Sequence, residues 1–332
     1  MNKMNKIMFY STLLMSSLMA ISGISWLTIW MGLELNLLSI LPLMKDKKMS
    51  SSEAMIKYFM VQTMSSSILL FSIVIFQLIK ETSLMNSMYL LLNSALLLKM
   101  GAAPFHFWYP EIMSGISWLT NFIMMTWQKL APMILITNSP ISINFISIFI
   151  MFSILMGNLQ GLNQICMRKI MAYSSINHTG WMLSILLTSY SIWILYFMIY
   201  SLINMNIMII MQKMNIFYLN QMTYLFSFNF KLKFMYTLNF LSLMGVPPFL
   251  GFMPKWLAIN HMIMNDFYTL VMIMVTFTLL GMYMYFRITF PAFSLFYKQT
   301  NFLNYFNMKY LIFLVNFLSL MSIAYIFPVN FM

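Results

Sequence analysis

The chain has 332 residues, of which 61% are hydrophobic and only 7% carry a charge. Soluble domains contain about 25% charged residues, so this composition excludes a water-soluble protein. The formal net charge of +12 would indicate nucleic-acid binding in a soluble protein. Here the basic residues lie in short stretches between apolar segments, which favours membrane topology as the explanation and predicts no nucleic-acid partner.

Long apolar segments follow one another along the whole chain. They predict an all-α, polytopic membrane bundle of about 11 transmembrane helices, with residues 1–332 as a single transmembrane domain. The basic start lacks a cleavage site, so we interpret it as a loop before the first helix. The predicted spans are 7–22, 24–44, 54–79, 87–113, 116–137, 141–161, 170–189, 192–211, 236–264, 267–288 and 309–327.

The basic residues separate by side when the spans are threaded through a membrane. An odd number of spans places the two termini on opposite sides, and Lys80 is then alone among the basic loop residues on one side. By the positive-inside rule, the N-terminus and the longest predicted loop, 212–235, lie on the inner side, which is the matrix in a mitochondrion. This inner side carries the other basic loop residues: Lys3, Lys6, Lys45, Lys47, Lys48, Lys57, Arg168, Lys169, Lys213, Lys231, Lys233, Arg287, Lys298 and Lys309.

A short motif occurs twice, at an offset of 144 residues. The segment 100–105, Met-Gly-Ala-Ala-Pro-Phe, recurs at 244–249 as Met-Gly-Val-Pro-Pro-Phe. This offset covers an odd number of predicted spans, so the copies cross the membrane in opposite directions, as in transporters with inverted repeats. The predicted halves are 7–137 and 141–288, with a C-terminal helix over 309–327. Each motif predicts a helix break within a span, at Gly101, Pro104, Gly245, Pro247 and Pro248.

Four ionisable residues fall inside predicted spans: Glu34, Lys99, Lys129 and Lys255. Each costs about 2.5 to 3.5 kcal/mol at a helix centre, so such residues are usually functional. A poorly solvated amine can load and release a proton near neutral pH, and a carboxylate nearby can supply the counter-charge. Because divalent cations prefer clustered oxygen ligands, the set predicts a proton relay rather than a metal site.

Structural interpretations remain open for parts of this set. Glu34 and Lys129 could form a structural ion pair, Lys255 could extend its amine to the interface, and each break could be a simple proline kink. His106 and His178 are further relay candidates, with helix-to-helix hydrogen bonding as the alternative.

Two other features bear on chemistry at the chain's surface and on redox function. Lys57 follows Glu53 by four residues at the end of a span, which predicts a surface ion pair between them. Cys166 is the one cysteine, which excludes an intrachain disulfide and a cysteine-ligated cluster supplied by this chain alone. The three histidines show no pairing suited to two haems or zinc. We therefore expect no redox centre, no metal, no bound cofactor and no catalytic residue.

Several motifs together resemble the family of NADH–ubiquinone oxidoreductase chain 2, and the insect-type mitochondrial sequences most. The resemblance covers nearly the whole chain, although the final sixty or so residues are recognisable only by hydropathy. The motifs are Ser52-Glu53-Ala54 with Lys57-Tyr58-Phe59, Lys99-Met100-Gly101 with Ala103-Pro104-Phe105-His106-Phe107-Trp108 and Pro110-Glu111, Thr126-Trp127-Gln128-Lys129-Leu130-Ala131-Pro132, Tyr173-Ser174-Ser175-Ile176 with His178 and Gly180-Trp181, and Pro247-Pro248 with Gly251-Phe252-Met253-Pro254-Lys255-Trp256.

The resemblance implies an antiporter-like, proton-translocating subunit in the membrane arm of respiratory complex I, in the mitochondrial inner membrane. It implies that Glu34, Lys99, Lys129 and Lys255 lie on a central hydrophilic axis. NADH, FMN, iron–sulfur clusters and ubiquinone would be handled by other subunits, whose quinone reduction drives the protons. The expected partners are the other membrane-arm subunits and phospholipids, with cardiolipin as a candidate, and the C-terminus would face the intermembrane space.

Two other functions are consistent with parts of the sequence. A stand-alone cation/proton antiporter would share the repeat and the buried lysines. A redox-carrying membrane enzyme such as a cytochrome is disfavoured because paired helical histidines are lacking. Co-migration with NADH dehydrogenase activity would separate a complex I subunit from a stand-alone antiporter, and a haem spectrum would test the cytochrome.

Overall fold

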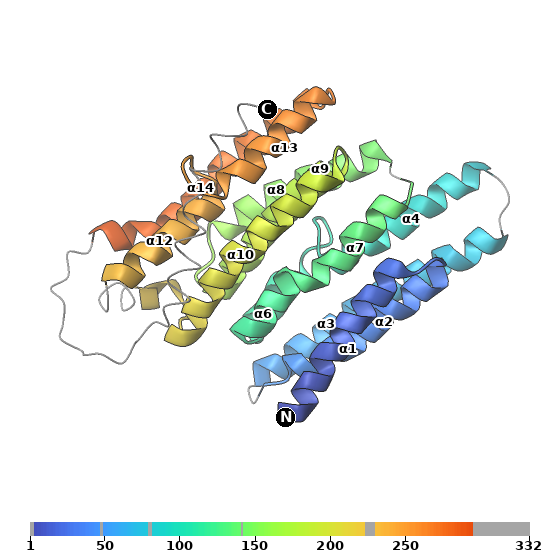
Figure 1. The fold of residues 1–332 in the computed structure, drawn as a ribbon, viewed down its shortest axis with the longest axis horizontal. Coiled ribbons are helices and arrows are strands. Elements are labelled where there is room, and N and C mark those ends of the chain that lie inside the picture. Colours follow the sequence, from blue (N-terminus) through green and yellow to red (C-terminus); the bar gives the residue numbers. More distant parts are fainter. Residues whose placement is uncertain (1–2, 47–48, 79–81, 141, 223–229, 295–332) are drawn as a thin grey trace. The chain divides into compact units, whose positions relative to one another are not determined.

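The computed structural model describes residues 3–46, 49–78, 82–140, 142–222 and 230–294. The regular secondary structure of these residues is helical, apart from one isolated antiparallel bridge between Cys166 and Tyr218 (Figure 1). The elements are α1 Lys3–Ser22, α2 Trp26–Met44, α3 Met49–Leu78, α4 Thr82–Met100, α5 Trp108–Gly115, α6 Trp118–Met125, α7 Trp127–Asn138, α8 Ile143–Gly161, α9 Met167–Leu186, α10 Tyr190–Met214, η1 Leu219–Gln221, α12 Phe230–Met244, α13 Phe252–Met264 and α14 Tyr268–Ser294.

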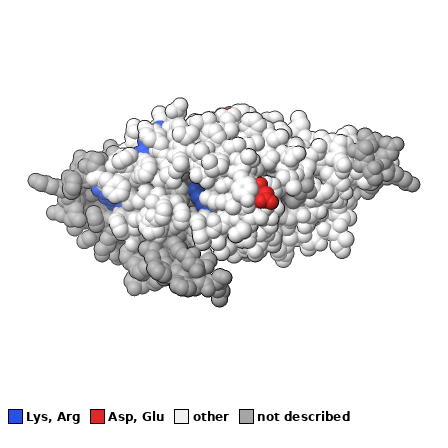
Figure 2. Space-filling model, turned by 90° about the horizontal axis from the view of Figure 1, so that it is seen from above, with Lys and Arg blue, Asp and Glu red and all other residues white. Residues whose placement is uncertain are grey.

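Several of these helices have the length and composition of membrane spans. A helix satisfies its own backbone hydrogen bonds, which is required in lipid, and about 20 apolar residues cross the hydrocarbon core. Figure 2 shows a face on which charged side chains are sparse among uncharged ones. Within the described ranges, five helices meet the length and hydropathy of a span: Trp26–Met44, Met49–Phe76, Ile143–Gly161, Tyr190–Met214 and Tyr268–Phe293.

The chain divides into two compact units, Met1–Ser153 and Ile154–Met332. In the first unit, α1 packs along α2, α3 packs against α2, α4 and α5, and α4 packs against α7. In the second unit, α10 packs against α9, α12 and α13, and α14 contacts α12, α13 and α9.

The two copies of the repeated motif have the same local backbone structure. After α4, Gly101 has φ +70°, and the N–H groups of Gly101 and Ala102 donate to the oxygens of Leu98 and Leu97 at 3.1 Å each. This is the Schellman arrangement, in which glycine takes the left-handed conformation that ends a helix.

The second copy repeats this ending 144 residues later. Gly245 has φ +81°, and the N–H groups of Gly245 and Val246 donate to the oxygens of Ser242 and Leu241 at 3.0 and 3.4 Å. The next helices also begin in register, α5 at Trp108 and α13 at Phe252. Residues 101–107 and 245–251 are therefore non-helical segments between two helices, and Pro104, Pro247 and Pro248 lie in them.

The structure differs from the predicted spans at two described places. The span 116–137 is interrupted at Thr126, whose φ of −113° and ψ of −74° separate α6 from α7. The Thr126 hydroxyl and N–H both donate to the oxygen of Phe122, at 2.7 and 3.1 Å, and such competition bends helices. The loop predicted over 212–235 is shorter, because α10 continues to Met214 and α12 begins at Phe230.

The predicted all-α fold is confirmed for the described residues. The total number of spans and the opposite orientation of the two halves stay predictions, and the helix predicted over 309–327 lies outside the described residues.

Candidate functional site

A small cavity in the first unit contains Lys99. Its amine-bearing side chain is only 6% exposed and belongs to the last turn of α4, just before the first helix break. The cavity has room for about one water molecule. Side chains from α2, α3, α4 and α7 line it: Leu33, Asn36, Leu37, Tyr58, Gln62, Lys99, Gln128 and Pro132.

Amide side chains tie the walls of this cavity together. Gln128 Nε2 donates to Asn36 Oδ1 at 2.8 Å, which joins α7 to α2. Gln62 Nε2 donates to the main-chain oxygen of Lys99 at 3.3 Å, which joins α3 to the end of α4. Such polar groups can hold water where lipid would be expected, and water can carry protons to and from an amine.

Glu34 lies on α2, next in sequence to the cavity residue Leu33. Its carboxylate is within electrostatic range of Lys99 and of Tyr58. Glu34 Oε1 is buried and accepts no hydrogen bond from the residues that the structure describes. A buried carboxylate oxygen without a donor is costly, so this oxygen is suited to a proton or a water molecule.

Lys129 follows the irregular residue Thr126 on α7 and is 1% exposed. Its Nζ atom lies 5.0 Å from the centre of the Tyr109 ring, within the range of a cation–π contact. Tyr109 belongs to α5, so the helix that follows the first break contributes one wall around Lys129.

Lys255 lies in the second unit, on α13, and is 8% exposed. Its Nζ atom donates to the main-chain oxygens of Met244 and Leu243 at 2.9 and 3.4 Å, and lies 5.9 Å from the ring centre of Trp181. The carbonyls at a helix C-terminus carry partial negative charge, so the Lys255 amine stabilises the C-terminal end of α12. Lys255 is thus turned inward in the described structure, whereas extension to an interface had been one interpretation of the sequence.

The two relay histidines have different surroundings. His106 lies in the first non-helical segment, with Nδ1 3.3 Å from the oxygen of Pro104 and its ring stacked on Phe107. His178 Nδ1 lies 2.8 Å from the hydroxyl of Tyr196, a hydrogen bond between α9 and α10. Both histidines are buried.

The structure therefore places Lys99 in the wall of one cavity in the first unit, with Glu34 in electrostatic range of Lys99 and with Lys129 next in sequence to the cavity residue Gln128. Lys255 is in the second unit, and its continuity with the other three remains a prediction. Among the described residues, no group of three or more His, Cys, Asp or Glu is arranged to hold a metal ion.

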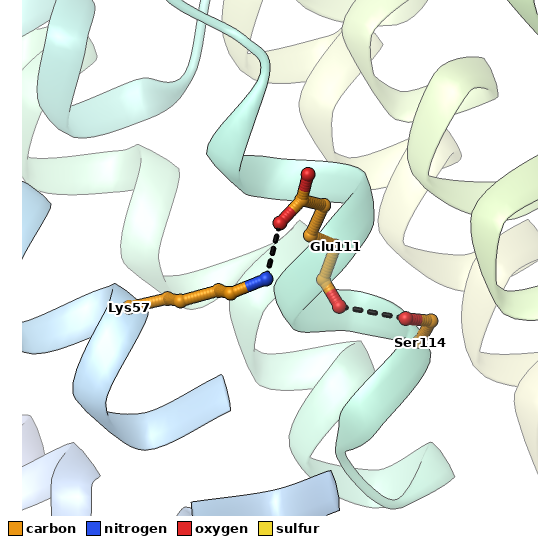
Figure 3. A network of polar contacts seen from close by, with 3 residues as sticks. All are labelled: Lys57, Glu111 and Ser114. Carbon is orange, nitrogen blue, oxygen red and sulfur yellow. Dashed lines mark hydrogen bonds and ion pairs between the residues drawn. The ribbon is translucent and has the colours of Figure 1, made fainter. Parts of the chain in front are cut away.

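An ion pair that the sequence did not predict joins α3 to α5 (Figure 3). Lys57 Nζ lies 2.5 Å from Glu111 Oε2, so the predicted partner, Glu53, is wrong. The Ser114 hydroxyl also donates to the main-chain oxygen of Glu111 at 2.7 Å. Glu53 was expected because it is four residues away on the same helix, but α5 places another acid closer. The sequence did contain one signal that Glu111 has a structural role. The dipeptide Pro110-Glu111 aligns with Pro254-Lys255 in the 144-residue repeat.

The sequence matches the family model of the NADH:quinone oxidoreductase/Mrp antiporter transmembrane region over residues 23–281. NADH-ubiquinone oxidoreductase chain 2 of Anopheles gambiae is 46% identical over 317 residues, covering 93% of this chain and 92% of that protein. The protein of the same name from Locusta migratoria is 42% identical, covering 97% of this chain and 95% of that one. Among solved structures, a chain of respiratory complex I from Thermus thermophilus matches with a TM-score of 0.85 at 21% identity, over 97% of this chain and 78% of that one.

Proposed function

Because this chain belongs to the family of NADH-ubiquinone oxidoreductase chain 2, we propose that it is a proton-translocating subunit in the membrane arm of respiratory complex I. It works in the mitochondrial inner membrane as a multi-pass protein, with its N-terminus in the matrix and its C-terminus in the intermembrane space. Its partners are the other membrane-arm subunits and the surrounding phospholipids, cardiolipin among the candidates.

The observation that carries this proposal is the burial of Lys99, Lys129 and Lys255 in an otherwise apolar chain. An intramembrane amine is expensive and is usually retained for function. Lys99 lies just before the first non-helical segment, and Lys255 binds the carbonyls that precede the second. Such segments have backbone carbonyls and N–H groups that can meet water and charge at membrane depth.

Each residue has a definite role in the proposed relay. Lys99 binds and releases the proton, and Glu34 supplies the counter-charge that favours loading. Lys129 receives the proton beside the Tyr109 ring, and Lys255 carries it in the second unit. His106 and His178 are candidates for transfer between these sites. The chain itself holds no redox centre in this proposal; NADH, FMN, the iron–sulfur clusters and ubiquinone belong to other subunits, whose electron transfer provides the energy.

The alternative function is a stand-alone cation/proton antiporter, since the matching family model includes Mrp antiporters. Purification from membranes in mild detergent separates the two. We expect the chain to co-migrate with NADH:ubiquinone reductase activity on a native gel. Migration without that activity, together with cation/proton exchange after reconstitution, would favour the antiporter instead.

A further inference from the structure

The eight-residue helix α5 is held along α3 by three contacts. The rings of Trp108 and Tyr58 lie 6.0 Å apart at one end. At the other end, Gly115 approaches α3 so closely that a Cβ atom would lie 2.5 Å from the oxygen of Ser50. Between these contacts lies the ion pair of Figure 3. Residue numbers rise along α5 as they fall along α3, so the two helices are antiparallel.

The ion pair is the one charged contact in this set. The side chains of Lys57 and Glu111 are 50% and 54% exposed in the chain alone. Opposite charges this close attract each other even where both side chains are exposed, so each side chain gains by keeping the other as its partner.

Other side chains of α5 contact the proposed proton site at Lys129 and the first helix break. Tyr109 lies under the Lys129 amine at 5.0 Å. A Cβ atom on Gly101, the first residue of the break, would lie 3.2 Å from Trp108 and 3.3 Å from Tyr109. Movement of α5 away from α3 would therefore displace both the ring beside Lys129 and the residues packed on the break.

The internal repeat gives independent support for an anchoring role. Glu111 occupies the register of Lys255, since both are the fourth residue of the helix that follows a break. Lys255 fixes α13 to the carbonyls of Leu243 and Met244. Glu111 fixes α5 to Lys57 on α3. Each half thus uses this position to attach the helix after its break, through opposite charges and different partners.

We propose that Lys57 and Glu111 are positioning residues of the proton relay. Their ion pair keeps α5 against α3. It thereby keeps Tyr109 beside Lys129, and keeps Trp108 packed on Gly101 at the first break. The inference rests on the proposed function, because it assigns the pair a role in proton movement.

The test uses the intact complex of a homologue whose gene can be changed, with equivalent substitutions. Glu111→Gln and Lys57→Met each remove one charge, and Lys57→Glu with Glu111→Lys exchanges the charges. Glu53→Gln is the matched control, because Glu53 is an exposed acid on the same helix outside the ion pair. Two quantities are measured: protons moved per NADH oxidised in vesicles, and backbone hydrogen exchange over 101–115.

We expect both single variants to lower the proton ratio and to speed exchange over 101–115 roughly two- to fivefold, as loss of one exposed ion pair permits. The double variant with swapped charges should recover most of the proton ratio and most of the slow hydrogen exchange. Glu53→Gln should change neither quantity. A normal proton ratio in both single variants, with faster exchange, would make the pair merely structural and overturn the proposal. A proton ratio in the charge-swapped double variant that is no higher than in the single variants would also contradict the proposal.

Two further arms keep the result interpretable. If the single variants do not assemble, Lys57→Arg and Glu111→Asp retain the opposite charges and should assemble and pump; loss of pumping in assembled complexes of either would contradict the proposal. If the proposed function itself is wrong, Lys99→Met will leave the proton ratio normal. The exchange difference between Glu111→Gln and Glu53→Gln still reports whether the pair holds α5.

Discussion

The amine of Lys255 donates a hydrogen bond to the main-chain oxygen of Met244 at 2.9 Å, and so satisfies the last residue of α12. The same residue is thus a cap for one helix and a member of the next. Its charge has a structural value that can be separated from its proposed proton-carrying role, since a guanidinium can also bind carbonyls but does not release its proton.

Replacing Lys255 by two different residues separates these roles. Lys255→Met should lose the cap, at a cost of about 0.3 to 1 kcal/mol for a cation at a helix C-terminus, and should lower proton pumping. Lys255→Arg should retain stability and still lower pumping. Thermal inactivation of the complex and proton uptake in vesicles measure the two effects. Normal pumping in the Arg variant would show that only the charge at this site matters.

Gly245→Ala should destabilise the second break. Gly245 has φ +81°, and an L-residue in the left-handed region costs about 1 to 2 kcal/mol. The added Cβ atom would also lie 2.9 Å from Lys255 Cδ and push on the capping side chain. We expect a lower inactivation temperature together with reduced pumping.

Asn215→Gly is the matched control for that variant, because Asn215 also has a positive φ, of 52°, at the end of α10. Glycine relieves the strain there, so stability should be unchanged or slightly higher. Equal stability of Gly245→Ala and the unmodified protein would mean that the break can adopt another backbone conformation.

The separation of basic residues predicts that Lys45, after α2, faces the matrix. Lys45 is exposed, so an amine reagent can reach it in the chain. A membrane-impermeant amine reagent applied to intact mitoplasts should leave Lys45 unmodified, whereas permeabilised mitoplasts should show modification by mass spectrometry. Modification of Lys45 without permeabilisation would reverse the proposed topology.

Local patterns in the sequence were enough to predict most of the helices. Hydropathy gave a span over 24–44, and α2 covers Trp26–Met44. The glycine and prolines near Gly101 and Gly245 indicated where the backbone leaves the helix, since both residues have the positive φ that glycine adopts easily. These features depend on neighbours along the chain.

Features that depend on packing were not predictable in the same way. The partner of Lys57 is 54 residues away and becomes available only when α5 lies along α3. The interruption at Thr126 depends on how its hydroxyl competes for the oxygen of Phe122. Hydropathy also places basic residues in loops by default, so it extended a loop over 230–235, where α12 has already begun.

The central claim is that Lys99 carries the proton, and its replacement by Met tests it most directly. Met fills a comparable space in an apolar helix and cannot titrate, so the complex should assemble. The measurement is protons moved per NADH oxidised in vesicles that contain the purified complex of a homologue with the equivalent substitution, compared with the unmodified complex. The relay predicts a sharp fall in the proton ratio and in coupled turnover, whereas an unchanged ratio in the assembled Lys99→Met complex would show that Lys99 is structural and that the relay is wrong.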